Sequence, residues 1–111
     1  MIHVIIWLAS IIAALTAAAK AEVGLASHYD TSSGASVACG GKLDEQALTA
    51  AHRTLPCGTH VRVENQQNGR SVVVTINDRG PFIKSRIIDL TPAAARALRF
   101  SGLARVSVTV E

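Results

Sequence analysis

The sequence is poor in aromatic and charged side chains, and these two shortages exclude some classes of function. Of its 111 residues, 4% are aromatic and 17% are charged. Single-stranded nucleic acid is bound by aromatic side chains interleaved with basic ones, and no such cluster occurs in this sequence. The formal net charge is +3, a mild excess that would favour contact with an anionic polymer such as a cell wall. We therefore expect no nucleic-acid partner.

Cysteine is also scarce, because only Cys39 and Cys57 occur and neither is part of a Cys-x-x-Cys pair. Metal sites usually show such a pair or a His-x-x-x-His spacing. The alternative to a disulfide is a metal site formed by the two cysteines together with His52 or His60. In a small exported domain an even number of cysteines usually forms disulfides, and a bridge closing about twenty residues stabilises by about 3 kcal/mol. We predict a Cys39–Cys57 disulfide, no metal and no cofactor.

The one long apolar run lies at the N-terminus, from residue 5 to residue 19, and ends before Lys20. The sequence Ala-Lys-Ala at 19–21 fits the small-x-small pattern of a signal-peptidase site. We predict a signal peptide at 1–21 and a mature domain at 22–111. The run is short for a membrane span, but the weak positive charge before it leaves an uncleaved anchor as the alternative. The expected protein is exported to the periplasm or secreted, is monomeric, and meets the membrane only through this segment.

The rest of the chain carries the patterns of short β-strands. Residues 23–29, 60–64, 71–76, 86–90 and 105–110 alternate apolar with polar residues or are rich in β-branched ones. Residues 47–52 are too short and too interrupted for an independent helix. A mainly β chain of five or six strands in under about one hundred residues predicts a small closed barrel, because closure removes exposed strand edges.

One short helix is predicted after the strand at 86–90. Thr91 is a favourable N-cap residue and Pro92 suits the first helical position. The helix is expected to run to about Arg99. Its apolar side is expected to consist of Ala93, Ala94, Ala97 and Leu98.

The candidate site follows the strand at 71–76, where Asn-Asp-Arg-Gly-Pro occupies residues 77–81. Asp78 and Arg79 would stand at a strand end, held by a rigid scaffold yet open to solvent. The alternative is structural, with Asp78 capping the N–H groups of the turn and Arg79 neutralising it.

Four blocks of the sequence together resemble the rare lipoprotein A family. These are Ala-Ser-x-Tyr at 26–29, Leu-Thr-Ala-Ala-His-Arg-Thr-Leu-Pro-x-Gly-Thr at 48–59, Asn-Asp-Arg-Gly-Pro at 77–81 and Arg-Ile-Ile-Asp-Leu at 86–90. The resemblance covers nearly all of the mature chain. It implies a six-stranded double-psi β-barrel with one or two short helices and an endolytic lytic transglycosylase acting on peptidoglycan glycan strands. It also implies a more distant relation to expansins and barwin-like proteins, many of which bind polysaccharide without cleaving it.

The resemblance also implies roles for individual residues. Asp78 matches the acidic active-site residue of the family, and His52 matches a histidine of the same groove. Tyr29, Thr49, Asn77 and Arg79 are the other predicted groove residues. The position of the family's catalytic glutamate is Gly41 here. This departure resembles the Ala-Cys-Gly turn of the barwin and expansin relatives.

Lytic transglycosylation requires a proton for the glycosidic oxygen and a base for the sugar's 6-hydroxyl, so one carboxyl can perform both transfers. We expect Asp78 to act as this acid and base with His52 as its assistant, the two side chains sharing one groove. Asp44 or Glu45 could supply a second carboxylate. Asp89 is another candidate, although bonding to backbone N–H groups at the strand-to-helix corner is its structural interpretation.

His28 and His60 are expected at the protein surface or at the rim of the groove.

The leading hypothesis from the resemblance is a peptidoglycan transglycosylase. The alternatives are a polysaccharide-binding barrel without catalysis, because Gly41 replaces the glutamate, and a secreted protein acting on a host or plant wall.

Overall fold

The computed structural model describes residues 20–30 and 36–111. Most of the predicted signal peptide therefore lies outside the described residues, and its cleavage stays a prediction. Within the part of the chain that the structure describes, no helix is both long and apolar enough to cross a membrane.

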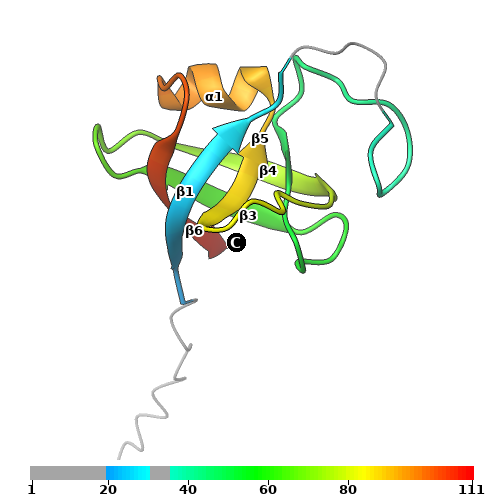
Figure 1. The fold of residues 1–111 in the computed structure, drawn as a ribbon, viewed down its shortest axis with the longest axis horizontal. Coiled ribbons are helices and arrows are strands. Elements are labelled where there is room, and N and C mark those ends of the chain that lie inside the picture. Colours follow the sequence, from blue (N-terminus) through cyan, green and yellow to red (C-terminus); the bar gives the residue numbers. More distant parts are fainter. Residues whose placement is uncertain (1–19, 31–35) are drawn as a thin grey trace, which may run out of the picture.

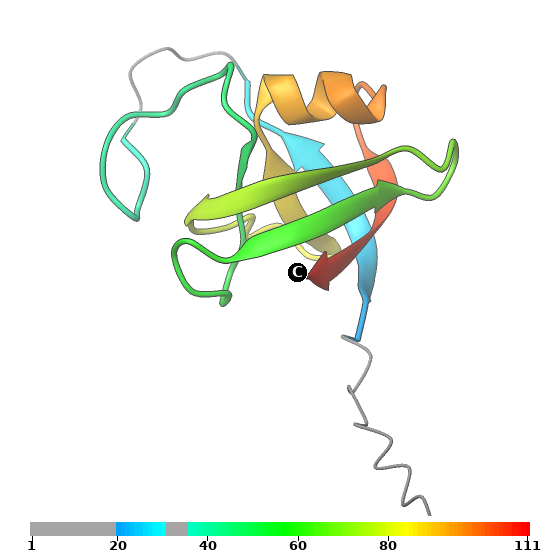
Figure 2. The same ribbon diagram turned by 180° about the vertical axis from the view of Figure 1, so that it is seen from behind.

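Six strands form a closed barrel with the order β1-β5-β2-β4-β3-β6. Figures 1 and 2 show this barrel from opposite sides, with the single described helix lying across one end. The elements are β1 (Glu22–His28), β2 (Thr49–Ala51), β3 (His60–Asn65), β4 (Ser71–Asp78), β5 (Arg86–Leu90), α1 (Pro92–Leu98) and β6 (Ala104–Val110). The predicted mainly β closed barrel is confirmed, and the short segment at 47–52 supplies its sixth strand.

Two of the strand pairs are parallel, namely β1 with β5 and β2 with β4. In the second pair Ala50 is the partner of Ile76 and Ala51 is the partner of Asp78, so Asn77 is an extra residue in β4. Such a β-bulge bends a strand and redirects its side chains. The bulge therefore sets the direction in which Asp78 leaves the barrel.

The barrel interior is filled by β-branched and other aliphatic side chains. Val61 and Val63 are fully buried, as the alternation in β3 predicts. Gly24 is needed where β1 meets β5, because a Cβ atom there would lie 2.7 Å from Cγ2 of Ile87. The core side chains are those of Ala26, Ala50, Val61, Val63, Val74, Ile76, Ile87, Ile88, Leu90, Ala94, Leu98, Ala104, Val106 and Val108.

Helix α1 begins as the sequence predicts. The hydroxyl of Thr91 accepts a hydrogen bond from Ala94 N at 3.3 Å and donates one to Ala47 O at 2.6 Å. This double contact fixes both the start of the helix and its rotation. The buried residues are Ala94, Ala95 and Leu98. Ala93 and Ala97, predicted on the apolar side, are only half-buried, because the cap turns the helix so that Ala95 faces the barrel.

The hairpin between β3 and β4 is joined to the end of α1 by two asparagine side chains. Nδ2 of Asn65 and Nδ2 of Asn68 each donate to Leu98 O at 3.0 Å. Asn65 is 1% exposed and its Oδ1 also accepts from Gln67 N, whereas Asn68 is exposed. Oδ1 of Asn68 likewise accepts from Arg70 N at 2.9 Å, so the two residues make the same pair of contacts in different surroundings.

Asn65→Ala should therefore destabilise the barrel more than Asn68→Ala does. Each substitution removes the same two contacts. At the buried Asn65 water replaces them poorly, which costs about 2 kcal/mol, whereas at the exposed Asn68 water replaces them at a cost of about 0.5 kcal/mol. Equilibrium unfolding in urea measures both changes. An equal decrease in the free energy of unfolding in both variants would contradict the prediction that the buried asparagine contributes more.

Candidate functional site

Asp78 is the last residue of β4, and its half-buried carboxyl group accepts three hydrogen bonds. Oδ1 accepts from Ala38 N at 2.8 Å and from Arg79 N at 2.9 Å, and Oδ2 accepts from the hydroxyl of Tyr29 at 2.7 Å. All three partners are donors, which suits a carboxylate. The bond from Arg79 N is the turn contact that the structural interpretation predicts, whereas the other two come from distant segments.

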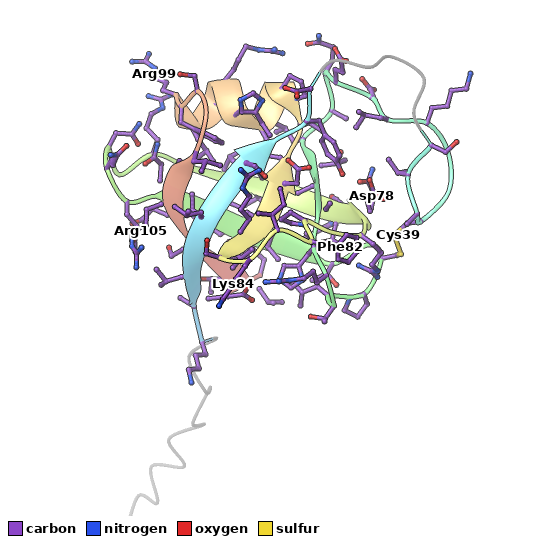
Figure 3. All side chains as sticks on the ribbon, viewed as in Figure 1. Cys39, Asp78, Phe82, Lys84, Arg99 and Arg105 are labelled. Atoms are coloured by element: carbon purple, nitrogen blue, oxygen red, sulfur yellow. A yellow bond between two sulfur atoms is a disulfide. The ribbon has the colours of Figure 1, made fainter. Side chains whose placement is uncertain are left out.

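A disulfide holds one of these distant segments in place. Cys39 and Cys57 are bonded, with their Cα atoms 5.9 Å apart, so the predicted pairing is confirmed. Cys39 N donates to Asn77 O, and Gly58 N donates to Ile76 O. The bridge therefore joins two loops that both bond to the end of β4. In Figure 3, Asp78 and Cys39 lie on the same side of the molecule.

The guanidinium group of Arg79 is directed away from the carboxylate of Asp78. Its Nη1 donates to Leu55 O at 2.7 Å and to His52 O at 3.0 Å. The ion pair expected of a neutralising partner is not among those formed by the described residues. Arg79 thus fastens the segment after β2 to the turn after β4, and its place in the groove stays a prediction.

Tyr29 is brought directly to Asp78. Burial raises the pKa of Tyr29 above its ordinary value of 10, and the hydrogen bond to Asp78 raises it further. The phenol therefore stays neutral and keeps its O–H as a donor at physiological pH. Of the predicted groove residues, Tyr29 contacts the carboxyl of Asp78 through its side chain, and Arg79 contacts it through its backbone N–H.

Asp89 is the second carboxyl group at this end of the barrel. Ala51 in β2 is the register partner of Asp78 on one side and of Asp89 on the other. Two strand spacings therefore separate the two aspartates, which places their Cα atoms about 10 Å apart. The side chain of Asp89 accepts a hydrogen bond from Ser27 Oγ at 3.3 Å, not from the backbone corner that its structural interpretation requires.

The surroundings of Asp89 favour its protonated form. Burial raises the pKa of Asp89 above 3.8. The Ser27 hydrogen bond and the positive charges of His28 and Arg86 lower the pKa in part, and the negative charge of Asp78 raises it. Two neighbouring carboxyl groups in different surroundings are a usual basis for acid and base roles.

His52 lies next to Asp78 through its backbone, with His52 N donating to Asp78 O at 3.1 Å. Its ring is 4% exposed. Nδ1 accepts from Thr54 N and Leu55 N, so Nε2 carries the proton and faces Glu22 Oε2 at 3.3 Å. The ring thus satisfies amides of an irregular turn, and none of the hydrogen bonds or ion pairs of the described residues joins it to the carboxyl of Asp78. The role of His52 as an assistant stays a prediction.

Asp44 and Glu45 lie in a loop against the start of α1. Oδ1 of Asp44 accepts from Gln46 N, and the carbonyl of Glu45 accepts from Ala93 N. No hydrogen bond or ion pair of the described residues links either carboxylate to Asp78. Their role as a second carboxylate stays a prediction.

Three oxygen atoms in the described chain are buried without a hydrogen-bond partner, namely Glu45 Oε1, Thr49 Oγ1 and Asn77 Oδ1. Thr49 and Asn77 are predicted groove residues, and Asn77 is the bulge residue of β4. Buried polar atoms of this kind mark places where water or a ligand can bind. The described residues enclose no pocket at the site, so the predicted groove stays a prediction.

Gly41 and the remaining histidines make no hydrogen bond to Asp78 or Asp89 among the described residues. Gly41 has φ +88°, and a Cβ atom there would meet nothing within 4 Å. His28 is half-buried and packs edge-on against Phe100 with ring centroids 5.8 Å apart, whereas His60 is exposed. Among the described side chains, no group of three or more could hold a metal ion.

A closed six-stranded barrel with two parallel pairs and one capped helix defines the double-psi β-barrel class, and similar solved structures agree. An expansin from Clavibacter michiganensis aligns with a TM-score of 0.65 at 23% identity, covering 83% of this chain and 50% of the expansin. A Streptomyces papain inhibitor aligns with a TM-score of 0.64 at 25% identity, covering 85% of this chain and 96% of the inhibitor.

Residues 21–110 match the family described as lytic transglycolase, and the chain belongs to this family. It is 52% identical over 91 residues to the probable endolytic peptidoglycan transglycosylase RlpA of Nostoc sp., and 51% identical over 89 residues to the endolytic peptidoglycan transglycosylase RlpA of Pseudomonas aeruginosa. These alignments cover 79% and 78% of this chain but only 24% and 26% of the relatives. The chain thus spans about a quarter of the length of these relatives.

Asp89→Asn should stabilise the protein increasingly as the pH rises. Because burial raises the folded-state pKa of Asp89 above 3.8, the folded protein holds a proton that the unfolded chain releases. The stability that Asp89 contributes is then complete below about pH 4 and is lost as the pH rises through the folded-state value. Asparagine stays neutral throughout, so the stability of the variant relative to the wild type should increase as the pH rises from about 4 through the folded-state pKa of Asp89.

Thermal midpoints of both proteins, measured from about pH 3 to pH 7, test this difference. Comparison with the wild type removes the contribution of all other titrating groups. Two parallel curves would show that the pKa of Asp89 is the same in the folded and unfolded states.

Proposed function

We propose that this protein is a lytic transglycosylase that cleaves peptidoglycan glycan strands. The observation that carries the proposal is the carboxyl group of Asp78, held by donors from three segments and flanked across β2 by a second carboxyl, Asp89. Relatives at about half identity are named endolytic peptidoglycan transglycosylases.

The proposed reaction consumes no water. The glycosidic oxygen takes a proton as its bond to the anomeric carbon of muramic acid breaks. The 6-hydroxyl of the same sugar then bonds to that carbon and loses its proton. The products are a shortened strand with a free hydroxyl and a strand ending in 1,6-anhydromuramic acid. Protons balance because one group donates a proton and another accepts one.

Two carboxyl groups with different surroundings suit these two transfers. We assign the donor role to Asp89, because its surroundings keep the proton on the carboxyl at a higher pH than usual. We assign the acceptor role to Asp78, whose oxygens accept hydrogen bonds and form no ion pair within the described residues. Tyr29 holds Asp78 in place as a neutral donor, and His52 positions the backbone of Asp78 from the buried side. After the reaction the proton returns from Asp78 to Asp89 through solvent.

Asp78→Asn and Asp89→Asn should each lower the rate of anhydromuramyl product formation by about 10²- to 10⁴-fold, the usual contribution of a general acid or base. The substrate is purified glycan strands from which stem peptides have been removed. Mass spectrometry of the soluble products measures the rate. Glu64→Gln removes an exposed carboxylate on β3 and serves as the control variant with the wild-type rate.

The double variant Asp44→Asn, Glu45→Gln decides between Asp89 and the two loop residues as the source of the second carboxylate. Full activity in this variant, with none in Asp89→Asn, supports the assignment above. The reverse pattern transfers the second role to the loop before β2. If the wild-type protein itself forms no anhydro products, the proposed transglycosylase activity is refuted.

The second candidate function is a binding module that holds glycan strands without cutting them. Gly41 favours it, because this residue occupies the position of the family's glutamate and brings no carboxyl group to the site. Such a module would bind the glycan strands in a co-sedimentation assay, and neither the wild type nor the variants would release products.

We also propose that the protein is exported and acts as a monomer. The Cys39–Cys57 bond supports an oxidising compartment.

A further inference from the structure

We propose that Phe82 is a stacking platform for a sugar ring next to the reacting bond. This proposal rests on the proposed function, because it places the glycan strand at the site of Asp78. It adds a position at which the strand is recognised, in the loop between β4 and β5.

Phe82 does not serve the packing of the barrel. Its side chain is 79% exposed, more than any other large hydrophobic residue of the described chain. The sequence holds only two phenylalanines, and the other one, Phe100, packs against the core. The neighbouring Ile83 is 55% exposed, so the loop presents an apolar surface to solvent. A single exposed apolar residue needs no explanation, but an adjacent pair beside a candidate site suggests binding.

The ring of Phe82 is held in a defined position although it is exposed. A Cβ atom on Gly80 would lie 3.4 Å from Cε2 and 3.5 Å from Cδ2 of Phe82. The ring therefore lies next to the space that a side chain at residue 80 would occupy, which is open because Gly80, a buried residue with φ +111°, has none. A ring that is fixed before binding loses little conformational freedom when a ligand stacks on it.

The loop that carries the ring is also held at both ends. Arg86 N donates to Ile83 O at 3.2 Å, and Leu25 N donates to Ser85 O at 3.1 Å. Arg79, at the other end, is fixed by the carbonyls of His52 and Leu55. Its guanidinium thereby contacts the segment after β2 and forms no ion pair with Asp78 among the described residues.

Phe82 lies close enough to Asp78 for both to meet the same strand. Four residues span at most about 14 Å when fully extended, which is the length of two or three sugar units. Figure 3 shows Phe82 beside the end of β4 that carries Asp78. A pyranose ring presents C–H groups on its face, and these pack on an aromatic ring without requiring charge or hydrogen-bond partners. The platform would accordingly favour neutral sugar rings over the charged stem peptides.

The test measures binding and catalysis separately. Phe82→Ala should raise KM for peptide-free glycan strands about 10-fold, a difference of about 1.4 kcal/mol, and leave kcat within about twofold because the ring touches no reacting atom. Phe82→Trp should restore the wild-type KM. Leu103→Ala, which truncates a 46% exposed side chain in the loop before β6, is the matched control and should change neither constant.

Binding in the inactive Asp78→Asn background keeps the result independent of cleavage. Co-sedimentation with glycan strands should weaken about 10-fold on adding Phe82→Ala, with unchanged thermal midpoints. If the wild type yields no anhydro products but Phe82→Ala weakens glycan binding, the stacking role of Phe82 is supported and the proposed enzymatic activity is refuted. Unchanged binding in Phe82→Ala overturns the platform, as does failure of the wild type to bind glycan. Loss of self-association in sedimentation velocity, in place of glycan binding, would assign the ring to contact with a second copy.

Discussion

The constraint on which the site depends is the fixation of the last residues of β4 by backbone donors from other segments. Ala38 N bonds the carboxyl of Asp78, His52 N bonds its carbonyl, and Cys39 N bonds the carbonyl of Asn77. A strand end that protrudes from a barrel would otherwise fray, because its polar groups lack ladder partners. Here each neighbouring segment completes the ladder, so the carboxyl has a fixed direction. The disulfide and the Arg79 contacts act on the same strand end by holding those segments together.

Several parts of this arrangement could be predicted from the sequence, because they depend on local chemistry. Alternation places Val61 and Val63 inside the barrel, and the cap at Thr91 starts the helix, since both depend on neighbours within a few residues. The position of Asp78 at a strand end follows from the β-branched run before it. The pairing of the two cysteines follows from their number and from the predicted export.

The placement of Asp89 beside Asp78 could not be predicted in this way. It results from β2, a three-residue strand that pairs parallel with β4 and antiparallel with β5. Nothing in three small residues predicts both neighbours, because such pairing is a property of the closed barrel. The direction of the His52 ring is similarly non-local, since it depends on Glu22 in β1 and on two amides of an irregular turn. A motif indicates which residues gather, but the partners of each side chain are determined by the topology.

The position of Arg79 explains how two carboxyl groups can remain different in one site. A guanidinium group directed at Asp78 would neutralise its charge and remove a cause that raises the pKa of Asp89. The carbonyls of His52 and Leu55 engage the guanidinium elsewhere, and neutral donors hold Asp78 instead. Neutral donors fix the carboxylate without cancelling its charge. The negative charge of Asp78 therefore still adds to the effect of burial in raising the pKa of Asp89, and the same contacts that order the strand end leave that charge in place.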